Sequence, residues 1–147
     1  MESLHYLLMK SHSIIHRKIF TEAQKIGLTS GQPKVLDYLW DHEGSDQKTI
    51  AAYCEIEPAT LGSILLRMEQ KGLIERRQEN GNRRSLFVHM TERGRIVAEQ
   101  MHTIFDMVDA QAVKHFTETE TEQLRYLLAK LCENMDEKSS GDMSSIN

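Results

Sequence analysis

The sequence predicts a mainly α-helical (α+β) fold with one small β-hairpin near its middle. Apolar residues recur at three- and four-residue steps over long stretches near both ends of the chain. Two short helices joined by a tight turn are expected within residues 46–71. Two short segments follow directly and flank Asn80-Gly81, a strong turn signal. This order of elements is typical of a winged helix-turn-helix carried between long terminal helices.

Residues 2–26 are expected to form the first long helix, because Gly27 is the first residue that interrupts its apolar spacing. The next helix follows at once, with Thr29 or Ser30 as its N-terminal cap and Pro33 in its first turn. Its expected buried stripe consists of Val35, Leu36, Leu39 and Trp40. The segment 41–45 is expected to be a loop.

The predicted helix-turn-helix begins at Asp46, which caps a short helix over about 46–53. The residues expected to face inward from this helix are Ile50, Ala51 and Tyr53. Residues 54–57 form the turn, and Pro58 opens the next helix, where its missing N–H costs nothing. The apolar face of that helix is formed by Leu61, Ile64, Leu65 and Met68, and Gly72 ends it.

Two strands are predicted after this helix, at residues 73–77 and 85–90. The second alternates, with Leu86, Val88 and Met90 on one side and Phe87 and His89 on the other. Thr91 then caps a long helix over about 91–115. A capping box of Thr117 and Glu120 starts the last helix, over about 118–136. The tail 137–147 has too little apolar content to order itself.

Charge is distributed unevenly along the chain. The net charge is −4, but residues 67–95 hold 8 Lys and Arg against 4 Asp and Glu, whereas residues 96–147 hold 4 against 10. A basic module attached to acidic helices suits a protein that contacts phosphates with one face only. An alternative is that this is the ordinary fluctuation of charge along a chain.

Composition excludes several classes of protein. No apolar run approaches the roughly 20 residues needed to cross a bilayer, and the N-terminus lacks the features of a signal peptide, so we expect a cytoplasmic protein without a membrane partner. The sequence shows no Gly-rich phosphate loop, no nucleophile motif and no carboxylate pair in a plausible pocket. We therefore expect no enzymatic activity and no cofactor.

The helix that starts at Pro58 is the candidate for contact with DNA. An α-helix fits the major groove, and small side chains such as Thr60 and Ser63 allow a close approach to base edges. Arg67, one turn further, can reach a guanine or the backbone. An alternative is that these residues are only the solvated face of an amphipathic helix. A second alternative is a winged helix that binds only proteins.

The hairpin directly after this helix favours DNA, because arginines surround its tip. They are Arg76, Arg77, Arg83 and Arg84. A guanidinium on such a loop can enter the narrow minor groove of A·T-rich DNA, where the negative potential is greatest.

Three stretches together resemble the multiple antibiotic resistance regulator (MarR) family of bacterial winged-helix transcription factors. They are LTSGQPKVLDYL (28–39), DQKTIAAYCEIEPATLGSILLRMEQKGLIER (46–76) and NRRSLFVHMTERG (82–94), in the order and spacing of the family. The resemblance covers roughly residues 2–136. It implies one domain over 1–136, with the winged helix at about 30–95.

The resemblance also implies roles for particular residues. The helix with Pro58, Ala59, Thr60, Ser63 and Arg67 is similar to the recognition helix of the family. Arg84 falls where the family places a wing arginine in the minor groove. The family usually has an aspartate two residues earlier, but Asn82 stands there in this chain, so Arg83 and Arg84 both remain candidates.

In this family the terminal helices interlock across a two-fold axis, so the resemblance implies a homodimer. Its two recognition helices would lie about one DNA turn apart, roughly 34 Å, and would bind a pseudo-palindromic operator. The implied function is a sequence-specific transcriptional regulator, most simply a repressor that a small aromatic effector releases from DNA.

Metal-responsive and redox-responsive regulation are the alternatives. His12 and His16 have metal-ligand spacing, but no further ligands join them convincingly. Cys54 and Cys132 are isolated, and the peroxide-sensing branch of the family has its cysteine in the first helix, where this chain has none. The rings that could line an effector crevice are Tyr6, His16, Tyr38 and Trp40. Core packing explains them equally well, so the sequence assigns no effector residue.

Overall fold

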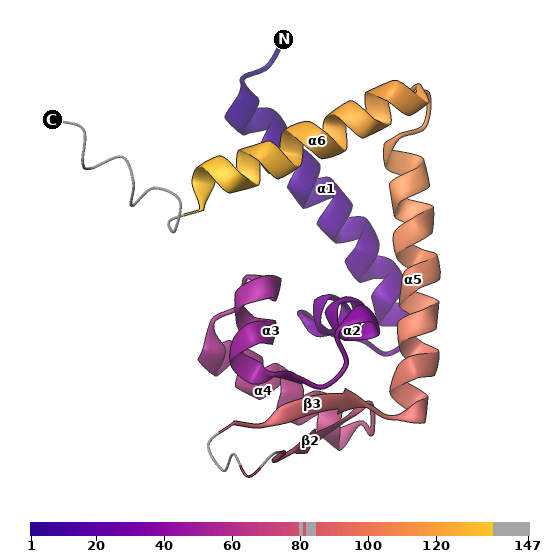
Figure 1. Ribbon diagram of the computed structural model, residues 1–147. Coiled ribbons are helices and arrows are strands. Elements are labelled where there is room, and N and C mark those ends of the chain that lie inside the picture. Colours follow the sequence, from indigo (N-terminus) through magenta and orange to yellow (C-terminus); the bar gives the residue numbers. More distant parts are fainter. Residues whose placement is uncertain (80, 82–84, 137–147) are drawn as a thin grey trace, which may run out of the picture. The chain divides into compact units, whose positions relative to one another are not determined.

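The computed structural model describes residues 1–79, 81 and 85–136, which fall in two compact units, Met1–Asp109 and Ala110–Asn147. The first contains α1 (Leu4–Lys25), α2 (Gln32–Asp41), β1 (Ser45–Asp46), α3 (Gln47–Cys54), α4 (Pro58–Gln70), β2 (Ile74–Arg77), β3 (Phe87–Met90) and most of α5 (Glu92–Ala112) (Figure 1). The second contains the end of α5 and α6 (Glu118–Met135). The mainly helical fold with a small sheet is therefore confirmed.

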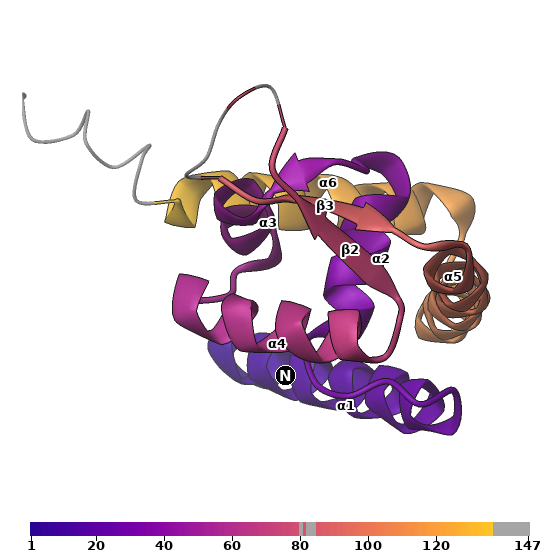
Figure 2. The same cartoon turned by 90° about the horizontal axis from the view of Figure 1, so that it is seen from below.

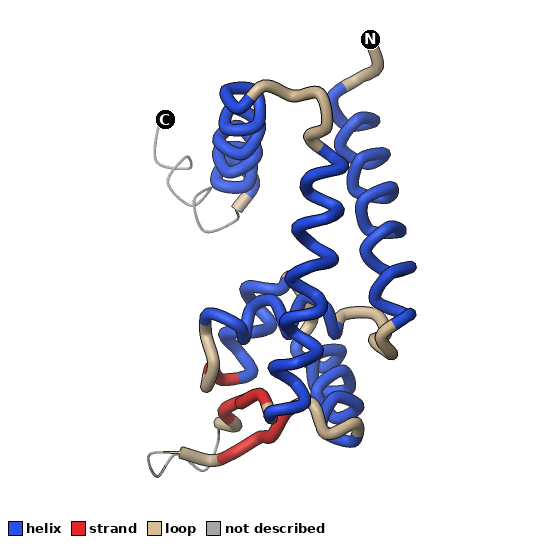
Figure 3. The backbone as a smooth tube through the Cα atoms, turned by 90° about the vertical axis from the view of Figure 1, so that its right-hand side faces the viewer, coloured by secondary structure: helices blue, strands red, loops and turns tan. Residues whose placement is uncertain are grey.

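The three strands form an antiparallel sheet in the order β1-β3-β2, close to α4 and to the start of α5 (Figure 3). Ile74 pairs with Met90 and Arg76 with Val88. Val88 and Met90 share one side of β3, as predicted, and the structure shows that this side is buried. The strand β1 was not predicted: residues 41–45 were expected to be a loop, but Ser45 pairs with Val88. Ser45 and Asp46 are both polar, so β1 has no alternation of apolar and polar residues. Only its pairing with β3 identifies it as a strand.

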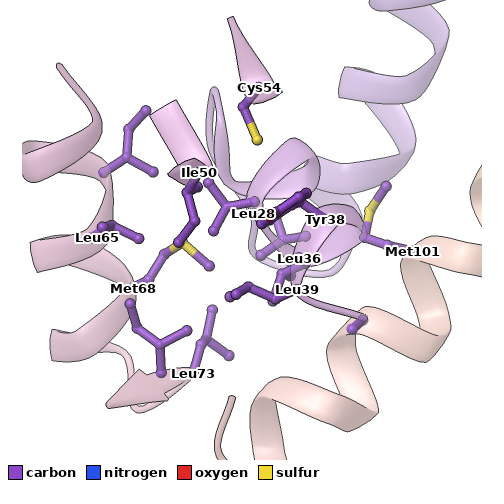
Figure 4. Packing of buried hydrophobic residues seen from close by; sticks show 14 of the residues in the cluster. Leu28, Leu36, Tyr38, Leu39, Ile50, Cys54, Leu65, Met68, Leu73 and Met101 are labelled. Carbon is purple, nitrogen blue, oxygen red and sulfur yellow. The ribbon is translucent and has the colours of Figure 1, made fainter. Parts of the chain in front are cut away.

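The hydrophobic core of the first unit lies between α2, α3, α4, the sheet and α5 (Figure 4). Leu36 and Leu39 of α2 and Ile50 of α3 are fully buried in it. From α4 the core receives Leu61, Ile64, Leu65 and Met68, as predicted. Met101 enters from α5, and this packing fixes α4 against the rest of the unit.

Two aromatic residues were assigned to the wrong environment. Trp40 is 41% exposed, whereas Tyr38 of the same helix is buried. Tyr53 is 67% exposed, and Cys54, one helical turn after Ile50, takes the inward position. Tyr53 instead packs on the ring of Tyr38, with ring centroids 4.6 Å apart. At the end of α3 the core has room for one side chain from the last turn, and the smaller side chain of Cys54 occupies it.

Helix termini confirm most predicted caps and correct one. The Thr49 N–H donates to the Asp46 carboxylate at 2.7 Å, and Thr117 forms its capping box with Glu120. The start of α2 differs: its cap is Gly31, with a left-handed backbone (φ 83°), and neither Thr29 nor Ser30 caps it. The Thr29 N–H instead donates to the buried Gln32 side chain, so this hydrogen bond ties the preceding loop to α2, and no side chain caps the helix.

The junction between the sheet and α5 is closely packed. The Thr91 N–H donates to the Leu73 carbonyl at 3.0 Å, and the Thr91 hydroxyl donates to the Gly72 carbonyl at 2.6 Å. The same hydroxyl accepts the Gly94 N–H, so Thr91 caps α5 as predicted. A Cβ atom at Gly94 would lie 2.0 Å from the Leu73 carbonyl oxygen. Only glycine therefore allows α5 to start this close to the end of α4.

The helix α6 has an apolar stripe but no buried side chain. Its exposed apolar residues include Leu124, Leu127, Leu128 and Met135. An amphipathic helix with an uncovered stripe lacks a packing partner within its own unit. Among the described residues, none of the helices has the length and apolarity that a membrane span requires.

Candidate nucleic-acid interface

The helix α4 presents its polar side to solvent along its full length. Figure 2 shows it lengthwise, with the turn from α3 at one end and the connection to β2 at the other. All five predicted contact residues on it are exposed: Pro58, Ala59, Thr60, Ser63 and Arg67. Pro58 occupies the first turn, as predicted. Since the opposite face of α4 is buried, the exposed face is held in a fixed orientation.

The arginines of the predicted wing have different environments. The Arg76 guanidinium donates to both carboxylate oxygens of Glu69, at 3.0 and 3.4 Å, and to the Gln47 side chain at 3.4 Å. Its side chain is only 18% exposed. Arg76 therefore joins β2 to α4 and α3 and is not available for DNA in this arrangement, contrary to the expectation that it belongs to the basic hairpin tip.

Arg77 is exposed, as a contact residue should be, and pairs with Glu75 at 3.2 Å. Both side chains are more than half exposed, so this ion pair is weak and a phosphate can replace it. The other predicted wing residues are Asn82, Arg83 and Arg84, which lie outside the described residues. Which arginine enters the minor groove stays a prediction.

The Arg76–Glu69 contact makes stability depend on pH. Hydrogen bonds from Arg76 hold the pKa of Glu69 below its ordinary value. A lowered folded-state pKa contributes stability above the unfolded value, about pH 4.5, and this contribution is lost as the pH falls through the folded value. Glu69→Gln is therefore expected to lower stability at pH 7 by up to about 1 kcal/mol, and less at pH 3.

Urea unfolding of wild type and Glu69→Gln at both pH values measures this difference. Glu75→Gln is the matched control, since its ion pair with Arg77 is open to solvent. An equal loss for Glu69→Gln at pH 7 and pH 3 would show that the carboxylate charge is not what stabilises the contact.

Two residues of the exposed α4 surface were not identified from the sequence. Leu66 is 46% exposed, although the other leucines of α4 are buried. Gly62 lies one turn before it, and a Cβ atom there would meet no described atom within 4 Å. The signal was present in the sequence: Leu66 departs from the spacing of the buried stripe, and a helix interior rarely contains glycine.

The alternative metal and redox sites find little geometric support. His12 and His16 stack on each other with centroids 5.8 Å apart, and the described residues contain no group of three or more His, Cys, Asp or Glu arranged for a metal ion. Cys54 is buried with its Sγ 3.6 Å from the Lys34 carbonyl. Burial raises the pKa of this thiol, which disfavours the reactive thiolate.

The candidate effector rings do not line one crevice. Trp40 packs on His102 at 4.7 Å, and Tyr38 contacts the rings of His42 and Tyr53. His16 borders a cavity of about 80 Å³ between α1, α2 and α5. Its lining includes Phe20, Phe105 and Lys34. A neighbouring groove of about 260 Å³ shares His16 and Lys34 and reaches Thr60 and Ile64 of α4.

Comparisons with known proteins agree with this architecture. Residues 28–86 match the model of the MarR family. The chain is 28% identical over 114 residues to the HTH-type transcriptional regulator MgrA of Staphylococcus aureus, covering 78% of this chain and 76% of the relative. These relatives are transcriptional regulators and not enzymes.

Solved structures show the same fold. A MarR-family regulator from Listeria monocytogenes, complexed with a 26mer DNA, is 21% identical, with a TM-score of 0.88 over 100% of this chain and 98% of that one. The MepR–DNA complex of S. aureus is 27% identical, with a TM-score of 0.81 over 92% of this chain and 100% of that one.

Proposed function

Because this chain belongs to the MarR family of DNA-binding transcriptional regulators, we propose that it is a homodimeric repressor that docks α4 in the major groove of a pseudo-palindromic operator. The observation that carries the docking is the division of α4 into two faces. One face is anchored in the core by Leu61, Leu65 and Met68, and the other presents Thr60, Ser63 and Arg67 to solvent. A helix held in this way can enter the groove as a rigid body.

The exposed residues of α4 divide into two roles in this proposal. Ala59, Thr60 and Ser63 are short, so the helix backbone approaches the base edges closely. Pro58 lies at the N-terminal end of the helix, where free backbone N–H groups attract a phosphate. Arg77 contacts phosphate from the hairpin, and Asn82, Arg83 and Arg84 supply the minor-groove contact.

Arg67 is the residue whose role an experiment can define. If Arg67 contacts a guanine, Arg67→Ala is expected to lower operator affinity by about 1–3 kcal/mol and to relax the preference at one base pair. If it contacts a phosphate, the loss should be similar for every sequence, with a shallower dependence on salt. Affinities of wild type and Arg67→Ala for an operator, its single-base variants and an unrelated duplex measure this.

Arg125→Ala in α6 is the matched control, since it removes the same charge outside the winged helix. Full affinity of Arg67→Ala for every duplex at every salt concentration would contradict the proposed docking of α4.

The dimer in this proposal is formed by the long helices. The uncovered stripe of α6 and exposed apolar residues of α1, including Leu4, Leu7 and Ile15, need a partner. A second copy of the chain supplies identical stripes and closes the assembly. Two α4 helices about one helical turn apart, roughly 34 Å, then bind two operator half-sites.

Release from DNA in this proposal uses the groove beside α4. His16 and Lys34 offer a planar ring and a positive charge there, and Glu55 and Glu57 add carboxylates, so the groove suits a small aromatic effector with polar substituents. Since the groove also reaches Thr60 and Ile64, an effector in it contacts the recognition helix directly. Binding would favour a dimer with the wrong spacing between its α4 helices. We place this function in the cytoplasm, with the DNA.

A further inference from the structure

The exposed face of α4 contains one large apolar side chain, Leu66. It is 46% exposed, while Leu61, Ile64 and Leu65 are at most 8% exposed. Single exposed leucines are common on protein surfaces, so exposure alone means little. Position distinguishes this one. Leu66 follows Ala59 by two helical turns and Ser63 by three residues, so it lies among the proposed base-contacting residues.

The surface beside Leu66 is open because of Gly62. Helical side chains lean toward the N-terminus, so Leu66 extends over the turn that contains Gly62 and Ser63. A Cβ atom at Gly62 would meet no described atom within 4 Å, and the backbone there is ordinary helix. Glycine weakens a helix interior relative to alanine. Among the described residues, no neighbour in this chain explains why a side chain is absent.

We propose that Leu66 and the notch at Gly62 bind the 5-methyl group of thymine in the major groove, and that these two residues contribute to operator specificity. Thymine is the base that presents an apolar group on its major-groove edge, and apolar side chains contact it there. Cytosine lacks this methyl and presents an amino group instead. An additional side chain at position 62 would fill the notch. This inference rests on the proposed docking of α4.

Replacement of thymine by deoxyuridine in the operator isolates the methyl group. The operator is first selected from random duplexes, and each thymine is then replaced symmetrically in both half-sites. At one position per half-site, wild type is expected to lose about 4-fold in affinity per methyl group removed, the value for burying one methylene-sized group. Leu66→Ala should bind the thymine and deoxyuridine operators equally. Leu66→Met, which keeps an apolar side chain, should retain the preference for thymine.

Gly62→Ala tests the notch independently of Leu66. Its melting temperature is expected to rise, because alanine favours helix and meets open space, while its operator affinity falls about 10-fold or more. A higher melting temperature with unchanged affinity would overturn the role of Gly62. Two results would overturn the role of Leu66. In the first, deoxyuridine has no effect on affinity at any position, and in the second, Leu66→Ala keeps the full preference for thymine.

A second measurement distinguishes failure of the proposed docking of α4 from failure of the methyl contact alone. Guanine N7 lies in the major groove, and wild type should protect it from methylation within each half-site if α4 docks there. Protection with no response to deoxyuridine contradicts only the methyl contact. Sequence-specific binding without N7 protection contradicts the docking and, with it, the methyl contact.

Discussion

Replacing Gly94 with alanine is expected to destabilise the winged helix more than any other single methyl addition among the glycines described. The new Cβ would lie 2.0 Å from the Leu73 carbonyl oxygen and 3.0 Å from its carbon. Both are backbone atoms, so no side-chain rotation relieves the clash. That carbonyl also accepts the Thr91 N–H at 3.0 Å, so moving it disrupts the start of α5. A loss of about 3 kcal/mol or more follows, comparable to a large core change.

Thermal unfolding of the purified protein measures this effect, with an expected fall in melting temperature of roughly 10 °C. Gly62→Ala is the matched control, because it adds the same methyl to a helical glycine with open space around it. A Gly94→Ala protein that melts within a few degrees of wild type would show that the junction between β2 and α5 can relax.

Leu128→Glu in α6 is expected to convert the proposed homodimer to a monomer and to lower operator affinity by about 100-fold or more. Leu128 lies on the same stripe as Leu124 and Met135, and it is 41% exposed in the isolated chain. Burying a carboxylate in an apolar interface without a partner costs several kcal/mol. A monomer can contact only one half-site, so the gain from binding both is lost. Analytical ultracentrifugation and operator titration measure the two effects.

Tyr126→Glu is the control for this change. Tyr126 is 64% exposed and lies about 200° around the helix from Leu128, with Lys130 over its ring. It should remain dimeric and bind the operator as wild type does. If Leu128→Glu stays dimeric with full affinity, the α6 stripe is not the dimer interface.

The helices and their caps were largely predictable because their signals are local. Thr117 with Glu120, Asp46 and Pro58 each act within one turn, and the structure places them as expected. The incorrect predictions concern residues whose environment depends on a partner that is distant in the sequence. Trp40 lies against His102, sixty-two residues away, and Ser45 becomes a strand only because Val88 is beside it. The periodicity of the sequence identifies neither His102 nor Val88 as a packing or pairing partner.

The same distinction holds for the interface. The exposed face of α4 follows from helical spacing, so Thr60, Ser63 and Arg67 could be predicted. The sequence does not distinguish the partly buried position of Arg76 from the exposed position of Arg77. Arg76 is held by the Glu69 carboxylate, which only the fold brings close to β2. Leu66 was overlooked because an apolar residue in an amphipathic helix is normally counted with its buried face.

The most direct test of the central claim is selection of bound sequences from random duplex DNA by the wild-type protein, with the affinity of the selected duplexes measured at two salt concentrations. A homodimer that docks two α4 helices should recover a pseudo-palindrome whose half-sites are about one helical turn apart. Its affinity should exceed that for unrelated duplexes by 10³-fold or more, about the lower limit for specific binding. Recovery of no common sequence, with only weak binding that salt abolishes, would contradict the account.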